Sequence, residues 1–520
     1  MRSNVEAGKR DGGEEPASLA AKTAKGAGWT VGWRFVTRNL GLISTLALVR
    51  LLAPADFGLV ALATGFIGMI DALSALGPQE AVVREPAPDR AMYDTAFTMN
   101  CLRNIGTAAI VAGTAWPVAA FFSEPRLTPV LLALSAGTFV TAFENIGIVD
   151  FQRELAFHKE FQLRVSARVV GVTLTILFAV LWRNYWAIII GILSTTVVRI
   201  VQSYTMSPYR PRLALRKWRQ IVGFSLWVWG SGLVLMIWDK IDSVVIGRFL
   251  GATAVGVFAV GWEIGSLPLT ELVLPLNRAL FSGFSEANRT GRGAAQLYLR
   301  VLAMTVVLTL PAGVGISLVA DPLVRLMLGE QWLSAVPLVQ ILGLAGAMFA
   351  PAYVAEALFK AEGRPHLNFH VGVVATCVKV PLFVALVSAF GLKGGAIAAT
   401  LAIAVQQICY LAIISRQIGS GVGELLRETW RSLVATAVMA GILAALGLGW
   451  EHGTTGAIGA AHSFFIACPV GALFYAAALL GIWLIQGRPE GAESDMLRLV
   501  GLWCRPALLA RLARPPADLG

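Results

Sequence analysis

Long apolar stretches follow one another along the whole chain and are separated by short polar loops. An α-helix needs about 18 or more mostly apolar residues to cross the hydrocarbon core of a bilayer. Fourteen stretches reach that length, and no loop is long enough for a folded domain outside the membrane. The pattern predicts an all-α polytopic membrane protein with about 14 transmembrane helices. The predicted spans are 29–52, 57–78, 93–121, 127–148, 164–182, 185–206, 221–250, 254–280, 297–320, 334–359, 366–390, 394–415, 431–450 and 463–486.

Basic residues are distributed unevenly over the loops. The loops that follow even-numbered spans and the two tails hold most of the lysines and arginines, whereas the loops that follow odd-numbered spans hold at most one each. Because cationic loops resist translocation, the side that is rich in lysine and arginine is predicted to face the cytoplasm, together with both termini. The single basic residues on the other side are Arg50, Arg126, Arg183, Arg248, Arg325 and Lys393.

Composition supports the membrane assignment and excludes several function classes. Only 14% of the 520 residues are charged, against about 25% in soluble domains. The net charge of +11 lies in loops and tails on one side, so it predicts no nucleic-acid partner. The sequence contains no phosphate-binding Gly-x-x-x-x-Gly-Lys-Ser/Thr loop, and no third ligand accompanies His366 and His370. The chain is predicted to be no enzyme and to hold no cofactor or metal.

A twelve-residue pattern occurs twice. Residues 50–61 and residues 248–259 share Arg, Leu, Gly and Ala at identical spacing, and each copy follows an odd-numbered span. Two parallel bundles related by an axis along the membrane normal are a transporter architecture, with the substrate path between the halves. The alternative is an ordinary turn followed by a new helix.

The repeat and the span count predict how the chain is divided. Two six-helix lobes are followed by a further pair of helices. The predicted parts are a cytoplasmic tail 1–28, an N-terminal lobe 29–206, a linker 207–220, a C-terminal lobe 221–415, a helix pair 431–486 and a cytoplasmic tail 487–520.

Charged residues inside the predicted spans are the candidate site. A charge at the centre of a spanning helix costs about 2.5–3.5 kcal/mol, so such residues normally face a cavity or a partner. We expect a partly cationic cavity that suits a phosphorylated or acidic solute, with acidic partners that neutralise arginines or carry protons. Charged residues near the ends of the predicted spans could instead extend to the lipid headgroups. The expected cavity residues are Arg34, Arg38, Arg103, Lys240 and Lys379, and the expected partners are Asp71, Glu144, Asp239, Asp242 and Glu263.

The chain resembles the polysaccharide transporter family of the multidrug/oligosaccharidyl-lipid/polysaccharide exporter superfamily. The most specific part of the resemblance is the first turn, Ala47-Leu-Val-Arg-Leu-Leu-Ala-Pro-Ala-Asp-Phe-Gly58. In the second half it rests on Asp239 and three runs, and it covers roughly residues 20–430. These runs are Gly247-Arg-Phe-Leu-Gly251, Gly261-Trp-Glu-Ile-Gly-Ser-Leu-Pro268 and Pro275-Leu-Asn-Arg-Ala-Leu-Phe281.

The resemblance implies a flippase of the bacterial inner membrane. Its cargo would be an undecaprenyl-diphosphate-linked oligosaccharide of capsule, O-antigen lipopolysaccharide or exopolysaccharide, moved by alternating access and driven by proton or sodium exchange. Its partners would be this lipid-linked oligosaccharide and membrane lipids, with a polysaccharide polymerase and a chain-length regulator as further candidates.

Two other functions stay open at this point. A drug or cation exporter of the same superfamily would need an anionic or aromatic-rich cavity, and the arginines count against it. A membrane-bound glycosyltransferase or polymerase would need a sizeable outer loop, and the outer loops are short.

Overall fold

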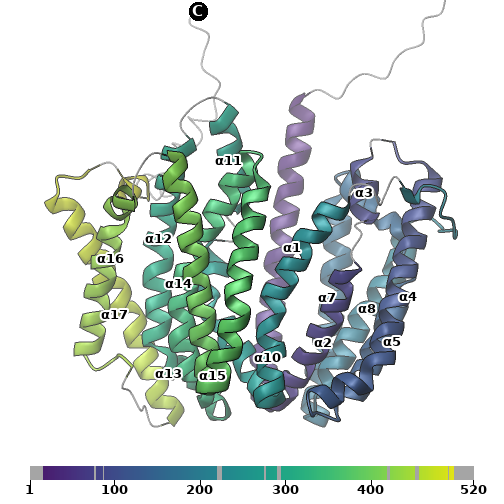
Figure 1. The fold of residues 1–520 in the computed structure, drawn as a ribbon, viewed down its shortest axis with the longest axis horizontal. Coiled ribbons are helices and arrows are strands. Elements are labelled where there is room, and N and C mark those ends of the chain that lie inside the picture. The colour runs from purple at the N-terminus through teal and green to yellow at the C-terminus, as the bar shows by residue number, and fades with distance from the viewer. Residues whose placement is uncertain are drawn as a thin grey trace, which may run out of the picture. The chain divides into compact units, whose positions relative to one another are not determined.

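All regular secondary structure is helical in the part of the chain that the computed structural model describes (Figure 1). That part comprises residues 16–74, 78–85, 87–219, 225–273, 277–289, 294–418, 422–450, 456–489 and 491–496. The first helices are α1 (Pro16–Leu51), α2 (Pro54–Leu73), α3 (Pro78–Arg84), α4 (Arg90–Phe121), α5 (Leu127–Thr141), η1 (Ile146–Val149), α6 (Asp150–Arg153), α7 (Phe157–Trp182) and α8 (Trp186–Met206). They are followed by α10 (Ser225–Gly265), η2 (Pro268–Val273), α11 (Asn277–Arg289), α12 (Ala294–Leu318), α13 (Ala320–Met327), η4 (Glu330–Ala335), α14 (Val336–Ala361), α15 (Pro365–Ile418), α16 (Val422–Ala445) and α17 (Gly456–Ile485).

The described helices confirm an all-α, multi-pass membrane protein. Nine of them are long and apolar enough to cross a bilayer, and α5 with the segment Ile146–Arg153, bent by 74°, makes a tenth. Two helices are interrupted by glycine: Gly251 within α10 has φ 82° and Gly391 within α15 has φ 60°. Only glycine adopts such angles without strain, so each of these helices is two helices joined by one residue.

The N-terminal helix is longer than hydropathy predicted. α1 begins at Pro16, ahead of the expected start at residue 29. Alanine is frequent between residues 17 and 27, and alanine has the highest helix propensity, which an apolar-span search does not weigh. Residues 1–15 and 497–520 of the two predicted tails lie outside the described residues.

The described chain divides into two compact units. The first comprises Met1–Leu51, Ile70–Ala115 and Thr128–Trp229, and the second comprises Leu52–Met69, Trp116–Leu127 and Gly230–Gly520.

In the first unit, α7 and α8 pack closely through a reciprocal pair of glycines. A Cβ atom built on Gly171 would lie 1.9 Å from the hydroxyl of Thr195, and one built on Gly191 would lie 1.6 Å from the hydroxyl of Thr175. Each threonine hydroxyl donates to the carbonyl of the glycine four residues before it, at 2.8 Å. Small residues at such crossings let helix backbones approach within a membrane.

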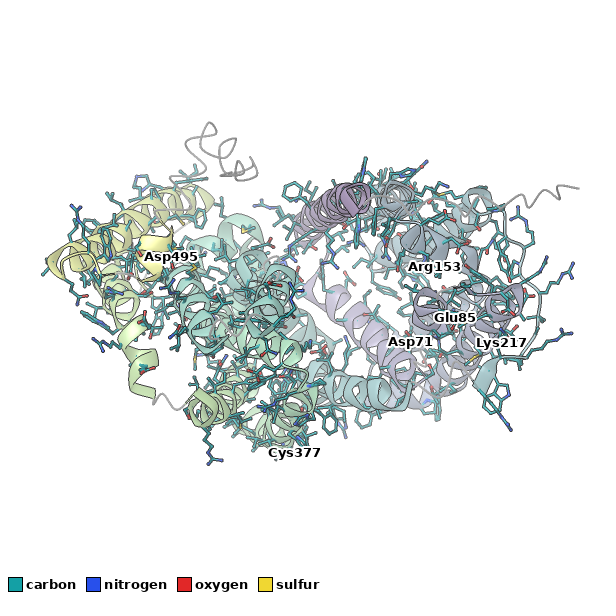
Figure 2. All side chains as sticks on the ribbon, turned by 90° about the horizontal axis from the view of Figure 1, so that it is seen from above. Asp71, Glu85, Arg153, Lys217, Cys377 and Asp495 are labelled. Atoms are coloured by element: carbon teal, nitrogen blue, oxygen red, sulfur yellow. The ribbon has the colours of Figure 1, made fainter. Side chains whose placement is uncertain are left out.

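An extended strap, residues 207–217, follows α8 and lies along the start of α4. The backbone N–H groups of Arg212 and Ala214 donate to Asp94 and Thr98 of α4, each at 2.9 Å. The Lys217 ammonium lies 2.8 Å from the Asp89 carboxylate, and this hydrogen bond holds the pKa of Asp89 below its ordinary value. Lys217 is on the same part of the first unit as Glu85 and Arg153 (Figure 2).

Asn145 fixes the strap to the bend between α5 and η1. The Asn145 side chain is fully buried. Its Oδ1 accepts from the N–H of Gly147 at 2.9 Å, and its Nδ2 donates to the carbonyl of Tyr209 at 2.7 Å. The Asn145 backbone N–H also donates to Ser203 at 3.1 Å. One side chain therefore caps a helix and holds the strap.

Replacing Asn145 with alanine is expected to destabilise the protein by about 1–3 kcal/mol, because the buried N–H of Gly147 loses its acceptor and the Tyr209 carbonyl loses one of its two donors. The measurement is the unfolding midpoint of the purified protein in detergent. Asn39→Ala is the matched control, because the Asn39 amide donates only within its own helix, to Phe35. Equal midpoints for the two variants would contradict the role given to Asn145.

The two copies of the sequence repeat meet in the second unit. A Cβ atom built on Gly58 would lie 1.6 Å from the carbonyl oxygen of Ala252, and one built on Gly256 would lie 2.1 Å from that of Pro54. The shared glycine of the repeat thus serves one purpose in both copies, a backbone-to-backbone crossing of α2 and α10.

The rest of the second unit is assembled around α12, α14 and α15, which pack side by side (Figure 1). Further close crossings occur at Gly313 with Gly343 and at Gly265 with Gly346. The second crossing joins the end of α10 to α14 immediately before η2, which is a π-helix. The helix pair α16 and α17 packs together and contacts α12 and α13.

Candidate functional site

Most predicted site residues of the first unit are paired. Arg103 of α4 lies 3.6 Å from Asp71 of α2. Asp71 is labelled in Figure 2. Ser74 and Thr107, one turn further along these helices, are within 3.3 Å of each other. Glu144, at the end of α5, pairs with Arg199 of α8 at 2.8 Å. Asp71 and Glu144 therefore each lie beside an arginine.

Arg34 and Arg38 lie one turn apart on α1, and both side chains are exposed within the described structure. The Arg34 guanidinium lies 5.6 Å from the ring of Trp33. The same ring lies 4.8 Å from the guanidinium of Arg164 in α7. This face of the first unit is cationic and carries an aromatic side chain.

A buried ion pair joins α10 to α15 in the second unit. The Lys379 ammonium lies 2.8 Å from one oxygen of Asp242 and 3.0 Å from the other, and it donates to the carbonyl of Trp238 at 2.7 Å. It also lies 4.5 Å from the Trp238 ring. The exposed fraction is 3% for Lys379 and 8% for Asp242. The ammonium thus has oxygen and aromatic partners from α10.

The other predicted residues of α10 make no ion pair or hydrogen bond with Lys379 or Asp242 in the part of the chain that the structure describes. Lys240 lies against Gly68 of α2 and lines a small hollow with Phe66 and Met69. Glu263 is exposed. Asp239 is exposed and lines a larger cavity, although its i, i+3 spacing places it on the same helix face as Asp242.

The larger cavity has a volume of about 510 Å³ and lies entirely within the second unit. Its walls come from α10, η2, α14 and α15. The aromatic residues of the wall are Trp238, Trp262, Tyr353, Phe369 and Tyr410, and the polar ones are Asp239, Ser266, Thr270, Glu356, Lys360, Asn368, Thr376 and Gln406. Lys360 and Glu356 form an ion pair.

The aromatic wall of this cavity was not predicted from the sequence. Trp238 and Trp262 each precede an acidic residue within an apolar span, and Trp262 lies in one of the runs that carry the family resemblance. A tryptophan beside an acid within a span was the available signal, because an intramembrane acid tends to line an interior.

Comparison with known families and proteins assigns the chain to a protein family. Residues 47–337, more than half of the sequence, match the family described as polysaccharide biosynthesis protein. The chain belongs to this family. The predicted membership in the polysaccharide transporter family is confirmed.

Relatives of this family match over most of their length. The lipopolysaccharide biosynthesis protein WzxC of Escherichia coli is 24% identical over 422 residues, which cover 79% of this chain and 85% of that protein. The succinoglycan biosynthesis transport protein ExoT of Rhizobium meliloti is 22% identical, covering 68% of this chain and 72% of that protein. Both relatives are named for polysaccharide biosynthesis and ExoT also for transport, in agreement with the predicted transport function.

Solved structures show the same fold as this family member. Lipid II flippase MurJ in an inward closed conformation superposes with a TM-score of 0.71 at 13% identity, over 88% of this chain and 99% of that one. A multidrug resistance MATE family transporter in an inward-facing conformation superposes with a TM-score of 0.58 at 18% identity, over 74% and 95% respectively.

Proposed function

We propose that this protein is a flippase that moves undecaprenyl-diphosphate-linked oligosaccharide repeat units across the bacterial inner membrane by alternating access. The family match over residues 47–337 carries the proposal. Two further observations support it: relatives named for lipopolysaccharide and succinoglycan biosynthesis, and a fold shared with a lipid flippase. The cargo would belong to capsule, O-antigen or exopolysaccharide synthesis.

The proposal includes fourteen crossings with both termini in the cytoplasm. The ten candidate spans become fourteen when α10 and α15 each cross twice, at their glycine breaks, and α1 and α16 cross once. The lobes are then residues 29–206 and 221–415, joined by the linker 207–220, and the helix pair is 431–486. The distribution of basic residues supports this orientation.

The charged residues take different roles in this proposal. Arg34, Arg38 and Arg103 supply cations for the diphosphate, because guanidinium groups bind phosphate oxygens strongly. Asp71 occupies Arg103 when cargo is absent. Lys379 and Asp242 are charge partners inside the second unit, while Asp239 lies at the cavity, where a coupling ion would be exchanged.

A second candidate is an exporter of cationic amphiphiles. The cavity of the second unit favours it, because tryptophan and tyrosine rings beside Asp239 and Glu356 suit an organic cation. The fold shared with a multidrug transporter is consistent with this alternative.

The double variant Arg34→Gln/Arg38→Gln is expected to lower polymer export by about tenfold or more, because hydrogen bonds to charged groups are lost. The measurement is surface polymer and lipid-linked precursor in a deletion strain complemented with the variant, and the precursor should accumulate. Arg289→Gln is the control, since the exposed Arg289 side chain pairs with the exposed Glu286 of the same helix, α11. Unchanged polymer in cells that express the double variant well would refute the role of these arginines.

Loss of drug resistance with normal polymer in the deletion strain would favour the second candidate.

A further inference from the structure

Three residues that line the cavity each carry a buried side-chain oxygen without a hydrogen-bond partner among the described residues. These oxygens are Oδ1 of Asn368, Oγ1 of Thr376 and Oε1 of Gln406. The Asn368 Nδ2 already donates to the carbonyl of Glu356 at 3.1 Å, so its oxygen is the atom that remains. Thr376 is only 7% exposed. Buried polar groups are nearly always hydrogen-bonded, so these atoms indicate a ligand that offers donors.

Other residues of the cavity wall are aromatic. Trp238 and Trp262 of α10 and Tyr353 of α14 contribute flat apolar surface. α10 ends three residues after Trp262 and is followed by the π-helix η2, whose residues Leu269 and Thr270 also line the cavity. π-Helical turns are frequent at functional sites, and irregular backbone at membrane depth is tolerated where it lines a cavity.

The charges of the wall nearly balance. Glu356 is neutralised by Lys360, which leaves Asp239 as the remaining carboxylate of the lining. The cavity therefore has no cationic cluster for a diphosphate. Its chemistry is that of several hydrogen-bond acceptors beside aromatic faces, in a volume of about 510 Å³, which is within the range of small-molecule sites.

We propose that this cavity binds a pyranose ring of the cargo and so reads the sugar part of the lipid-linked oligosaccharide. A pyranose offers hydroxyl donors around its edge and apolar C–H groups on its faces. The hydroxyls would donate to Asn368, Thr376 and Gln406, and a face would stack on Trp238, Trp262 or Tyr353. The inference rests on the proposed flippase function, and it assigns sugar recognition to residues distinct from the arginines given to the diphosphate.

Donor count separates a sugar from an organic cation. A tetraphenylphosphonium ion has no O–H or N–H group, so it would leave all three buried acceptors unpaired. The cavity also extends to Pro365 and Lys360, which border the loop between α14 and α15. On the proposed orientation this loop is cytoplasmic, the side from which a flippase takes its cargo.

The test uses saturation-transfer difference NMR on the full-length protein in nanodiscs. The probes are methyl glycosides of glucose, galactose and mannose, with glycerol and tetraphenylphosphonium as comparisons. We expect transfer to the ring protons of at least one glycoside. Thr376→Val should weaken its apparent affinity about three- to tenfold, and Trp262→Leu should weaken it at least as much. Thr400→Val is the matched control, because the Thr400 hydroxyl donates to Ala396 within its own helix at 2.9 Å.

The outcomes that overturn the inference are distinct. Saturation transfer to tetraphenylphosphonium alone would show that the cavity binds cations and not sugars. If glycerol bound as well as the glycosides did, the cavity would bind polyol headgroups and would not recognise a sugar ring. Glycoside signals unaffected by Thr376→Val and Trp262→Leu would place binding elsewhere. None of these results changes the polymer and precursor levels of the deletion strain, which test the flippase function separately.

Discussion

Replacing Lys379 with methionine is expected to destabilise the protein by about 3–5 kcal/mol. The ammonium donates to Oδ2 of Asp242 and to the carbonyl of Trp238, and it lies 2.8 Å from Oδ1 of Asp242, in a site where both charged side chains are buried. Removing one partner of a buried ion pair leaves the other charge without compensation, and this is strongly destabilising. The measurement is the unfolding midpoint of the purified protein in detergent.

Two controls separate the buried charge from lost packing. Lys240→Met changes a neighbouring lysine of α10 that lies against Gly68 of α2, and it should shift the midpoint far less. The double variant Lys379→Met/Asp242→Leu should recover most of the loss, because apolar replacements of a buried pair are often neutral. If the double variant were as unstable as the single one, the effect would come from packing and not from charge.

Gly58→Ala is expected to disrupt the crossing of α2 and α10 and to reduce both stability and export. The added Cβ would lie 1.6 Å from the carbonyl oxygen of Ala252 and 2.9 Å from the backbone nitrogen of Gly256. Because backbone atoms cannot rotate away as a side chain can, the helices must separate. Overpacking usually costs about 1–3 kcal/mol, and a backbone clash belongs at the upper end.

Gly65→Ala provides a control within the same helix. Gly65 is also buried in α2, but a Cβ built on it meets nothing within 4 Å. Alanine should be neutral there, or stabilising by up to about 1 kcal/mol through helix propensity. Gly256→Ala should behave as Gly58→Ala does, since the two glycines face each other. Equal melting temperatures for Gly58→Ala and Gly65→Ala would disprove the close crossing.

Much of the fold could be predicted from hydropathy, because a bilayer imposes one length scale on every crossing helix. The breaks at Gly251 and Gly391 fall between predicted spans, and the repeated glycine proved to be a shared contact. The start of α1 was missed because alanine-rich polar sequence forms helix without being apolar.

The site was less predictable because its partners are distant in sequence. Spacing places Asp239 and Asp242 on one helix face, yet one lines a cavity and the other is buried against Lys379, 137 positions away. Which acid is paired depends on how α15 packs against α10, and hydropathy carries no information about that contact. The unpartnered oxygens of Asn368 and Gln406 are likewise a property of packing.

The single-residue turn at Gly391 has a consequence for biogenesis. α15 runs through 54 residues with no polar segment at its midpoint beyond Lys393, so an insertion machinery meets it as one hydrophobic hairpin. Its two halves would enter the bilayer together, and their topology would be decided by Arg364 and Arg416 at the flanks. Newly made chain would therefore be committed to the membrane in pairs of helices at this point.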